Sequence, residues 1–245
     1  MNRTVLVAHR GAPRGAAAEN TIRAFREAAA AGADGVELDV RGTKDGRIAV
    51  VHDAEVLRGG KRVPVRSLSM EELRDPSVEA ADRVPPLEEA IRALLGRTGV
   101  IVEIKEPGLE EKVAAILTSL KADVRLPWLL VGSFHPSVVK GFAAAAPGIR
   151  RALIVADRGP GIAGWFRGKF PVGAFRSSGA TDLMPCAALV TPSLVSSVGD
   201  GGGRVMAWTV NDPDEAARLV EAGVEGVITD DLEAVGASIR PEGAG

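Results

Sequence analysis

Ionisable side chains follow or interrupt several short apolar runs in the first half of the chain. Two of the three histidines, His9 and His52, each follow such a run, and Glu37 and Asp39 interrupt another. A charged group at such a position costs several kcal/mol to bury unless a metal or a charged ligand compensates it. We therefore interpret these residues as parts of an active site.

The spacing of the carboxylates predicts that three of them meet. Successive side chains of a strand point to opposite faces, so Glu37 and Asp39 share one face. The run 100–105 repeats the pattern, with Glu103 and Lys105 on one face. Three carboxylates in contact raise one another's pKa unless a cation offsets their charge. The pattern predicts one divalent cation held by these carboxylates, and the all-oxygen donor set favours Mg²⁺ or Ca²⁺ over zinc.

Two cationic side chains, Arg10 and Lys105, leave the site able to take one further anion, and a phosphodiester carries a single negative charge. His9 and His52 would flank that anion. Two histidines suit in-line phosphoryl transfer, one as general base and one as general acid, and the residues do not decide which takes which role. An alternative for Lys105 is a simple ion pair with Glu103 or Glu106.

The elements that must position these residues alternate between apolar runs and helical patterns, which favours βα units and a parallel sheet. Eight runs give about 31 residues per unit, close to the density of a (β/α)₈ barrel, whose active sites lie at the carboxyl ends of the strands. We therefore predict an α/β fold, a (β/α)₈ TIM barrel, with residues 1–245 as a single domain. The predicted strands are Val5–Ala8, Gly35–Val40, Val100–Ile104, Leu129–Phe134, Ala152–Ala156, Ala188–Thr191, Val205–Val210 and Gly226–Thr229.

One connection is different from the others. The link 42–46 is too short for a helical crossover, so the run that ends at His52 must return antiparallel to the second strand as a hairpin. Counting back from the turn places His52 nearly opposite Leu38 and Asp39. This hairpin and a short helix form a small insertion after the second strand, over about residues 43–85, which we expect above the carboxyl-terminal mouth of the barrel.

Amphipathic patterns predict helices over 21–31, 86–95 and 212–222. Either Asn20 or Thr21 is suited to cap the first of them, because a short polar side chain accepts a hydrogen bond from the first helical turn.

Composition excludes several classes of partner. The chain has 30 basic and 32 acidic residues and a net charge of −2, so nothing in its charge indicates a nucleic-acid or membrane partner. No apolar run approaches the roughly 20 residues of a membrane span, and the first residues do not form a secretory signal. The single cysteine, Cys186, has no partner for an internal disulfide. We expect a cytoplasmic protein with a small-molecule substrate and no stable membrane insertion, and its oligomeric state stays open.

The chemically important residues also fall in the order of a known family. The chain resembles the glycerophosphodiester phosphodiesterases of the phospholipase-C-like barrel superfamily. The second half matches more loosely than the first. The motifs that carry the resemblance are His9-Arg10-Gly11, Glu19-Asn20-Thr21, Gly32-Ala33-Asp34, Glu37-Leu38-Asp39-Val40, Thr43-Lys44-Asp45-Gly46, His52-Asp53, Pro86-Leu87-Glu88-Glu89, Glu103-Ile104-Lys105, Ser133-Phe134, Trp208-Thr209-Val210-Asn211 and Gly226-Val227-Ile228-Thr229-Asp230.

The resemblance implies metal-dependent hydrolysis of glycerophosphodiesters to glycerol 3-phosphate and an alcohol. It implies a histidine acid–base pair, a metal held by three carboxylates, two cations on the phosphate and two aromatic walls for the glycerol. Those residues are, in the same order, His9 and His52, then Glu37, Asp39 and Glu103, then Arg10 and Lys105, then Phe134 and Trp208.

Two features of the chain leave substrate choice open. It has no tyrosine, and the segment 157–186 is rich in glycine and aromatic residues, including Trp165 and Phe166. That segment is an outer amphipathic helix and loop, or a lid that contacts lipid aggregates. The rival functions are a lipid phosphodiesterase similar to lysophospholipase D or sphingomyelinase D, and a non-catalytic barrel that binds phosphorylated ligands. An alternative for Trp208 is that it only packs in the barrel core and does not contact the substrate.

Overall fold

A computed structural model describes residues 3–12, 18–77, 79–123, 126–157 and 168–240. Eight parallel strands form a closed barrel, because the first strand pairs with both the second and the last. The predicted (β/α)₈ TIM barrel is confirmed. In order around the barrel the strands are β1 (Val5–Ala8), β2 (Gly35–Gly42), β6 (Gly99–Ile104), β7 (Leu129–Ser133), β8 (Arg150–Val155), β9 (Asp182–Pro185), β10 (Arg204–Ala207) and β11 (Gly226–Thr229).

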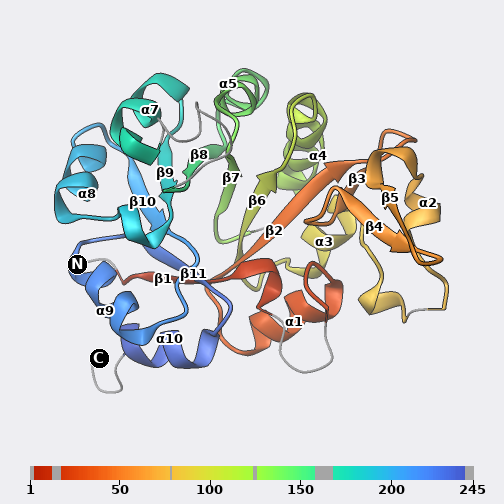
Figure 1. Ribbon diagram of the computed structural model, residues 1–245, viewed down its shortest axis with the longest axis horizontal. Coiled ribbons are helices and arrows are strands. Elements are labelled where there is room, and N and C mark those ends of the chain that lie inside the picture. The colour runs from red at the N-terminus through yellow and green to blue at the C-terminus, as the bar shows by residue number, and fades with distance from the viewer. Residues whose placement is uncertain (1–2, 13–17, 78, 124–125, 158–167, 241–245) are drawn as a thin grey trace.

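Helices surround the strands (Figure 1). Four of those described have proline in their first turn, where the missing N–H removes no helical hydrogen bond. No helix of the described residues is long and apolar enough to cross a membrane. The helices are α1 (Ile22–Ala30), α3 (Leu87–Ala93), α4 (Glu110–Asp123), α5 (Pro136–Ala145), α7 (Pro171–Ser178), α8 (Pro192–Gly199), α9 (Pro213–Glu221) and α10 (Leu232–Ile239).

The alternation of side chains along β2 divides two hydrophobic clusters. Val36, Leu38 and Val40 are fully buried in the cluster between the barrel and its helices. A smaller cluster fills the barrel interior and includes Ile101 of β6. Because alternate residues of a strand point to opposite faces, the acidic residues between the three outward-facing ones point into the barrel.

The sixth strand was predicted wrongly. The sequence favours the apolar run 188–191, but the strand is β9, Asp182–Pro185, and residues 187–189 form a short 3₁₀ helix. A charged residue begins β9 and a proline ends it, which hides a strand of four residues. Asp182 is tolerated there because Arg150 of β8 donates two hydrogen bonds to its carboxylate, at 2.6 and 3.1 Å.

The insertion after β2 begins as predicted. Strand β3 (Ile48–Val50) pairs antiparallel with the end of β2, Val50 opposite Val40, which brings His52 beside Leu38. The backbone N–H of the residue before His52 donates to the carbonyl of Asp39 at 2.9 Å. The expected register is therefore confirmed.

A second hairpin in the insertion was not predicted. It consists of β4 (Glu55–Arg58) and β5 (Lys61–Pro64), joined by Gly59 and Gly60, which both have positive φ. A Gly-Gly pair between two short runs is a hairpin signal that could have found it. A one-turn helix, α2 (Met70–Leu73), follows, and Figure 1 shows β4, β5 and α2 near the end of β2. Trp165 and Phe166 lie outside the described residues.

Candidate active site

The structure brings all nine predicted site residues together at the carboxyl-terminal end of the barrel. Eight of them line one cavity of about 200 Å³. The ninth, Asp39, is 1% exposed and lies within ion-pair distance of Arg10 and Lys105. The cavity is lined by His9, Arg10, Glu37, His52, Glu103, Lys105, Phe134 and Trp208, together with Ile154, Met184, Thr209 and Ile228.

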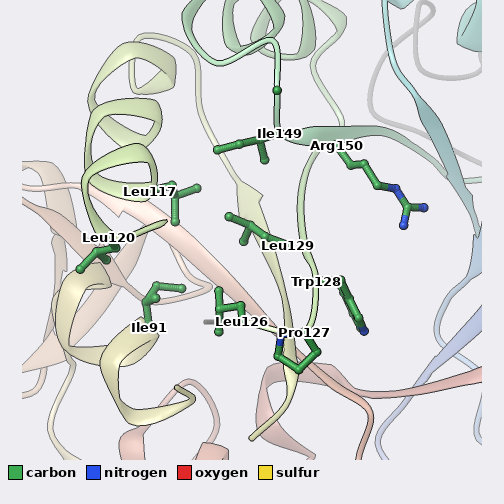
Figure 2. A pocket seen from close by; sticks show the side chains of 10 residues that line it. Ile91, Leu117, Leu120, Leu126, Pro127, Trp128, Leu129, Ile149 and Arg150 are labelled. Atoms are coloured by element: carbon green, nitrogen blue, oxygen red, sulfur yellow. The ribbon is translucent and has the colours of Figure 1, made fainter. Parts of the chain in front are cut away.

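A different cavity, of about 280 Å³, lies between α3, α4 and strands β7 and β8 (Figure 2). Its lining is apolar apart from Arg150, the one charged residue among those that line it. Arg150 is committed to Asp182 and Glu225. The second cavity is therefore larger than the first, but the described residues that line it offer no free ionisable group for catalysis.

The acidic side chains form a buried cluster. Glu37, Asp39 and Glu103 are at most 8% exposed, and one oxygen from each lies within 4.8 Å of the others. The strand register explains the contact, because Asp39 of β2 is paired with Glu103 of β6. Burial first, and then repulsion by the other two carboxylates, raise the pKa of Glu37 well above its usual range. Burial also raises the pKa of Glu103, against the opposing effect of Lys105.

The donor set of this cluster fits a divalent cation. Glu103 Oε1 lies 2.7 Å from Lys105 Nζ, and this one contact leaves further lone pairs of the carboxylate for a cation. Lys105 Nζ is also 3.3 Å from Asp39 Oδ1. Burial disfavours the ammonium group, but the two carboxylates outweigh burial and raise the pKa of Lys105. Lys105 and Arg10, which is shared with Glu19, do not balance the three buried carboxylates, and a bound divalent cation would complete the balance.

Arg10 is held in a rare backbone conformation by the acidic residues around it. Its φ of 50° lies in the left-handed region, which non-glycine residues seldom adopt. Its backbone N–H donates to Glu37 Oε2 at 3.0 Å, and its guanidinium donates to both oxygens of Glu19 at 3.0 and 3.1 Å. Its Nε lies 3.2 Å from Asp39 Oδ2. The arrangement fixes the guanidinium at the edge of the acidic cluster.

Asn20 has a different role from the one that its type suggests. The residue that caps α1 is Thr21, whose hydroxyl accepts a hydrogen bond from Ala24 N. Asn20 instead forms a reciprocal pair with Asp39: its Nδ2 donates to Asp39 Oδ2 at 2.9 Å, and Asp39 N donates to Asn20 Oδ1 at 3.1 Å. Asn20 is only 4% exposed. It therefore orients one carboxylate of the cluster.

His9 and His52 are each paired with an aspartate that was not among the predicted site residues. His9 Nδ1 lies 2.8 Å from Asp230 Oδ1, and His52 Nδ1 lies 2.8 Å from Asp53 Oδ1. The hydrogen bond to the histidine lowers the pKa of each aspartate. An ionised partner on Nδ1 requires a proton there, which leaves Nε2 of each ring for proton transfer.

The two aspartates differ in how far they lie from their histidines in the sequence. Asp53 directly follows its histidine, so adjacency was a signal. Asp230 is 221 residues from His9, and they meet because Ala8 of β1 is paired with Thr229 of β11. Asn211 orients Asp230, since its Nδ2 donates to Asp230 Oδ2 at 2.9 Å.

Two aromatic side chains form one wall of the cavity. Phe134 and Trp208 meet edge to face, with ring centroids 5.4 Å apart and an interplanar angle of 89°. The indole Nε1 of Trp208 donates to the Met184 carbonyl at 2.9 Å, which fixes the ring. Lys105 Nζ lies 5.9 Å from the centroid of Phe134. This wall suits the carbon skeleton of a small polyol next to the charged groups.

Known proteins resemble the chain over almost its whole length. The chain is 30% identical to a glycerophosphodiester phosphodiesterase from Caldanaerobacter subterraneus, over 98% of the chain and 100% of the relative. It is 30% identical to one from Bacillus altitudinis, over 93% of the chain and 94% of that protein.

Solved structures agree. A phosphodiesterase from Oleispira antarctica, in complex with its product sn-glycerol-3-phosphate, superposes with a TM-score of 0.78 and 25% identity, over 97% of each chain. A glycerophosphodiester phosphodiesterase from Agrobacterium tumefaciens gives a TM-score of 0.76 and 27% identity, over 96% of this chain and 99% of that one. The model of the glycerophosphoryl diester phosphodiesterase family matches residues 9–234. The chain therefore belongs to the glycerophosphoryl diester phosphodiesterase family.

Proposed function

We propose that the chain hydrolyses glycerophosphodiesters to glycerol 3-phosphate and an alcohol, with one divalent cation bound at the acidic cluster. The observation that carries the proposal is the meeting of two His–Asp pairs, two cationic side chains and three buried carboxylates at one cavity. The glycerol 3-phosphate in the Oleispira structure supports the product.

Arg10 and Lys105 would hold the phosphate, because both cations lie at the cavity and beside the acidic cluster. When bound, a divalent cation supplies positive charge that polarises the phosphoryl oxygens. Glu37, Asp39 and Glu103 would hold it.

The two histidines would move the protons. One imidazole takes a proton through Nε2 from the attacking group, which is either a water molecule or a hydroxyl of the glycerol. The other gives a proton to the oxygen of the leaving alcohol. Asp230 and Asp53 would keep His9 and His52 in the required tautomers, because each aspartate lies 2.8 Å from Nδ1 of its histidine. If a glycerol hydroxyl attacks, water opens the cyclic phosphate in a second step with the two roles exchanged.

The first prediction tests the reaction. With Mg²⁺ or Ca²⁺, the protein is expected to release glycerol 3-phosphate from glycerophosphocholine, glycerophosphoethanolamine and glycerophosphoglycerol. A chelator should abolish the release. A coupled glycerol 3-phosphate assay measures it. Cleavage of lysophosphatidylcholine alone would assign the chain to lipid phosphodiesterases of the D type, and no cleavage of any ester would favour a phosphate-binding barrel.

A second prediction concerns Asn20. Asn20→Ala leaves Asp39 with an unpaired buried N–H, so the free energy of unfolding should fall by about 1–3 kcal/mol. Because Asn20 no longer orients the Asp39 carboxylate, the affinity for Mg²⁺ or Ca²⁺ should fall about 10- to 100-fold. Calorimetry measures this affinity. Thr21→Ala is the matched control, because it removes the cap of α1 at a cost of about 1 kcal/mol and should leave metal affinity unchanged. Equal metal affinities for the two variants would contradict the assigned role of Asn20.

A further inference from the structure

One arginine outside the cavity is bonded to the backbone that carries His52. Arg41 lies on β2, two residues beyond Asp39, and is not among the described residues that line the cavity. Its Nε donates to the carbonyl of His52 at 2.8 Å. The side chain of Arg41 is 15% exposed, so solvent competes little for this bond.

Glu106 holds Arg41 in place. Glu106 Oε2 accepts from Arg41 Nη1 at 3.2 Å, and its Oε1 accepts from the backbone N–H of Gly42 at 3.0 Å. The carboxylate thus fixes both the guanidinium and the end of β2. Glu106 follows Lys105, whose backbone N–H donates to the carbonyl of Val40 at 3.2 Å. The ends of β2 and β6, which carry the acidic cluster, are therefore joined to the guanidinium that holds His52.

The segment that carries His52 needs such a support. Strand β3 ends at Val50, and the last ladder contact is the bond from Val51 N to the carbonyl of Asp39. His52 lies beyond it, and its side chain is 31% exposed. Acid–base catalysis requires its imidazole at a fixed distance from the reacting oxygen, and an error of about 1 Å can cost about 10²-fold in rate.

We propose that Arg41, fixed by Glu106, is a positioning residue that holds His52 at the catalytic distance from the acidic cluster. The inference rests on the proposed acid–base role of His52. Among the contacts described, Arg41 touches neither the cavity nor the three carboxylates, and its direct bond toward the site is the one to His52.

The test combines substitution of Arg41 with that of His52. Arg41→Met keeps the length of the side chain and removes its donors, and it is expected to lower kcat at least about tenfold with KM changed less than about threefold. Arg41→Lys keeps the positive charge but places all its donors on one nitrogen. One nitrogen cannot reproduce the separate bonds of Nε to the His52 carbonyl and of Nη1 to Glu106, so the kcat of this variant should lie between those of the wild type and Arg41→Met.

The decisive comparison is non-additivity. In the His52→Ala background, Arg41→Met should cause no further loss of kcat, because the residue through which it acts is absent. Arg151→Met is the matched control, since Arg151 Nε donates to the Gly179 carbonyl at 2.8 Å away from the cavity. That control should keep wild-type kcat in both backgrounds. Thermal unfolding of every variant separates loss of position from loss of fold.

Two results would overturn the inference. One is a wild-type kcat for Arg41→Met, and the other is an equal loss of kcat in the presence and absence of His52. If His52→Ala alone keeps wild-type kcat, the acid–base role falls and the inference falls with it. The single His52 variant therefore distinguishes failure of the proposed function from failure of the role of Arg41.

Discussion

Replacement of His9 or His52 by alanine is expected to lower kcat about 10²- to 10⁴-fold, the usual range for a general acid or base. Both side chains line the cavity and are held by an aspartate through Nδ1. They are 20% and 31% exposed, so their removal takes little packing from the core. Steady-state kinetics on a glycerophosphodiester measures the effect, and unfolding curves should stay near those of the wild type.

His135→Ala is the matched control. His135 is the third histidine, and it precedes α5 and is not among the described residues that line the cavity. Its substitution should keep kcat within about twofold, in line with a residue outside the catalytic pair. Near-normal turnover after loss of His9 or of His52 would remove that residue from the mechanism.

The sequence predicts the half of the site that depends on strand alternation. Positions within two apolar runs predict that Glu37 and Asp39 share one face of a strand, and that Glu103 and Lys105 share one face of another. This prediction uses only the alternation of side chains along a strand, which is a local property. His52 followed from the short link and its hairpin register, which is also local.

The other half depends on tertiary contacts. Asp230 reaches His9 only because the last strand closes against the first. Asn20 stands where a helix cap is common. Its bond to Asp39 forms because its loop lies against β2, and no local sequence pattern predicts that contact. Strand β9 was missed for a related reason. Its buried Asp182 is stabilised by Arg150, which is 32 residues away in the sequence.

The acidic cluster should also make the metal-free protein less stable as the pH rises. Burial raises the pKa of Glu37 and of Glu103 above their values in the unfolded chain. Below the titration of an ordinary glutamate, near about pH 4.3, both carboxyls are protonated in both states and contribute no difference. Above it the folded state binds more protons than the unfolded state, so the free energy of unfolding falls as pH rises, until the folded carboxyls have also ionised.

A divalent cation should reverse this effect. It binds the ionised carboxylates of the folded chain, so the stabilisation by Mg²⁺ or Ca²⁺ is expected to grow from pH 5 to pH 8. It should reach about 2.7 kcal/mol where free metal is about 100 times its Kd. Chemical unfolding at fixed pH, with metal and with chelator, measures both trends.

Glu37→Gln separates the cost of the cluster from its use. The amide is nearly the same size, and its oxygen can accept the hydrogen bond from Arg10 N that Glu37 accepts at 3.0 Å. Without metal at pH 8 this variant should be more stable than the wild type, because an unbalanced buried charge has been removed. It should also lose most of the stabilisation by metal, and its kcat should fall at least about 10²-fold because a cation ligand is missing.

Asp45→Asn provides the contrast for that variant. Asp45 is an exposed turn carboxylate whose pKa is lowered by its hydrogen bond from Thr43, so its linkage has the opposite sign. Its substitution should reduce stability at neutral pH and leave the response to metal intact. A Glu37→Gln protein that is less stable than the wild type without metal, yet still responds fully to Mg²⁺ and Ca²⁺, would show that the cluster is balanced by Lys105 and Arg10 alone. The three carboxylates would then be a structural ion-pair network, and the divalent cation would have to be placed elsewhere or given up.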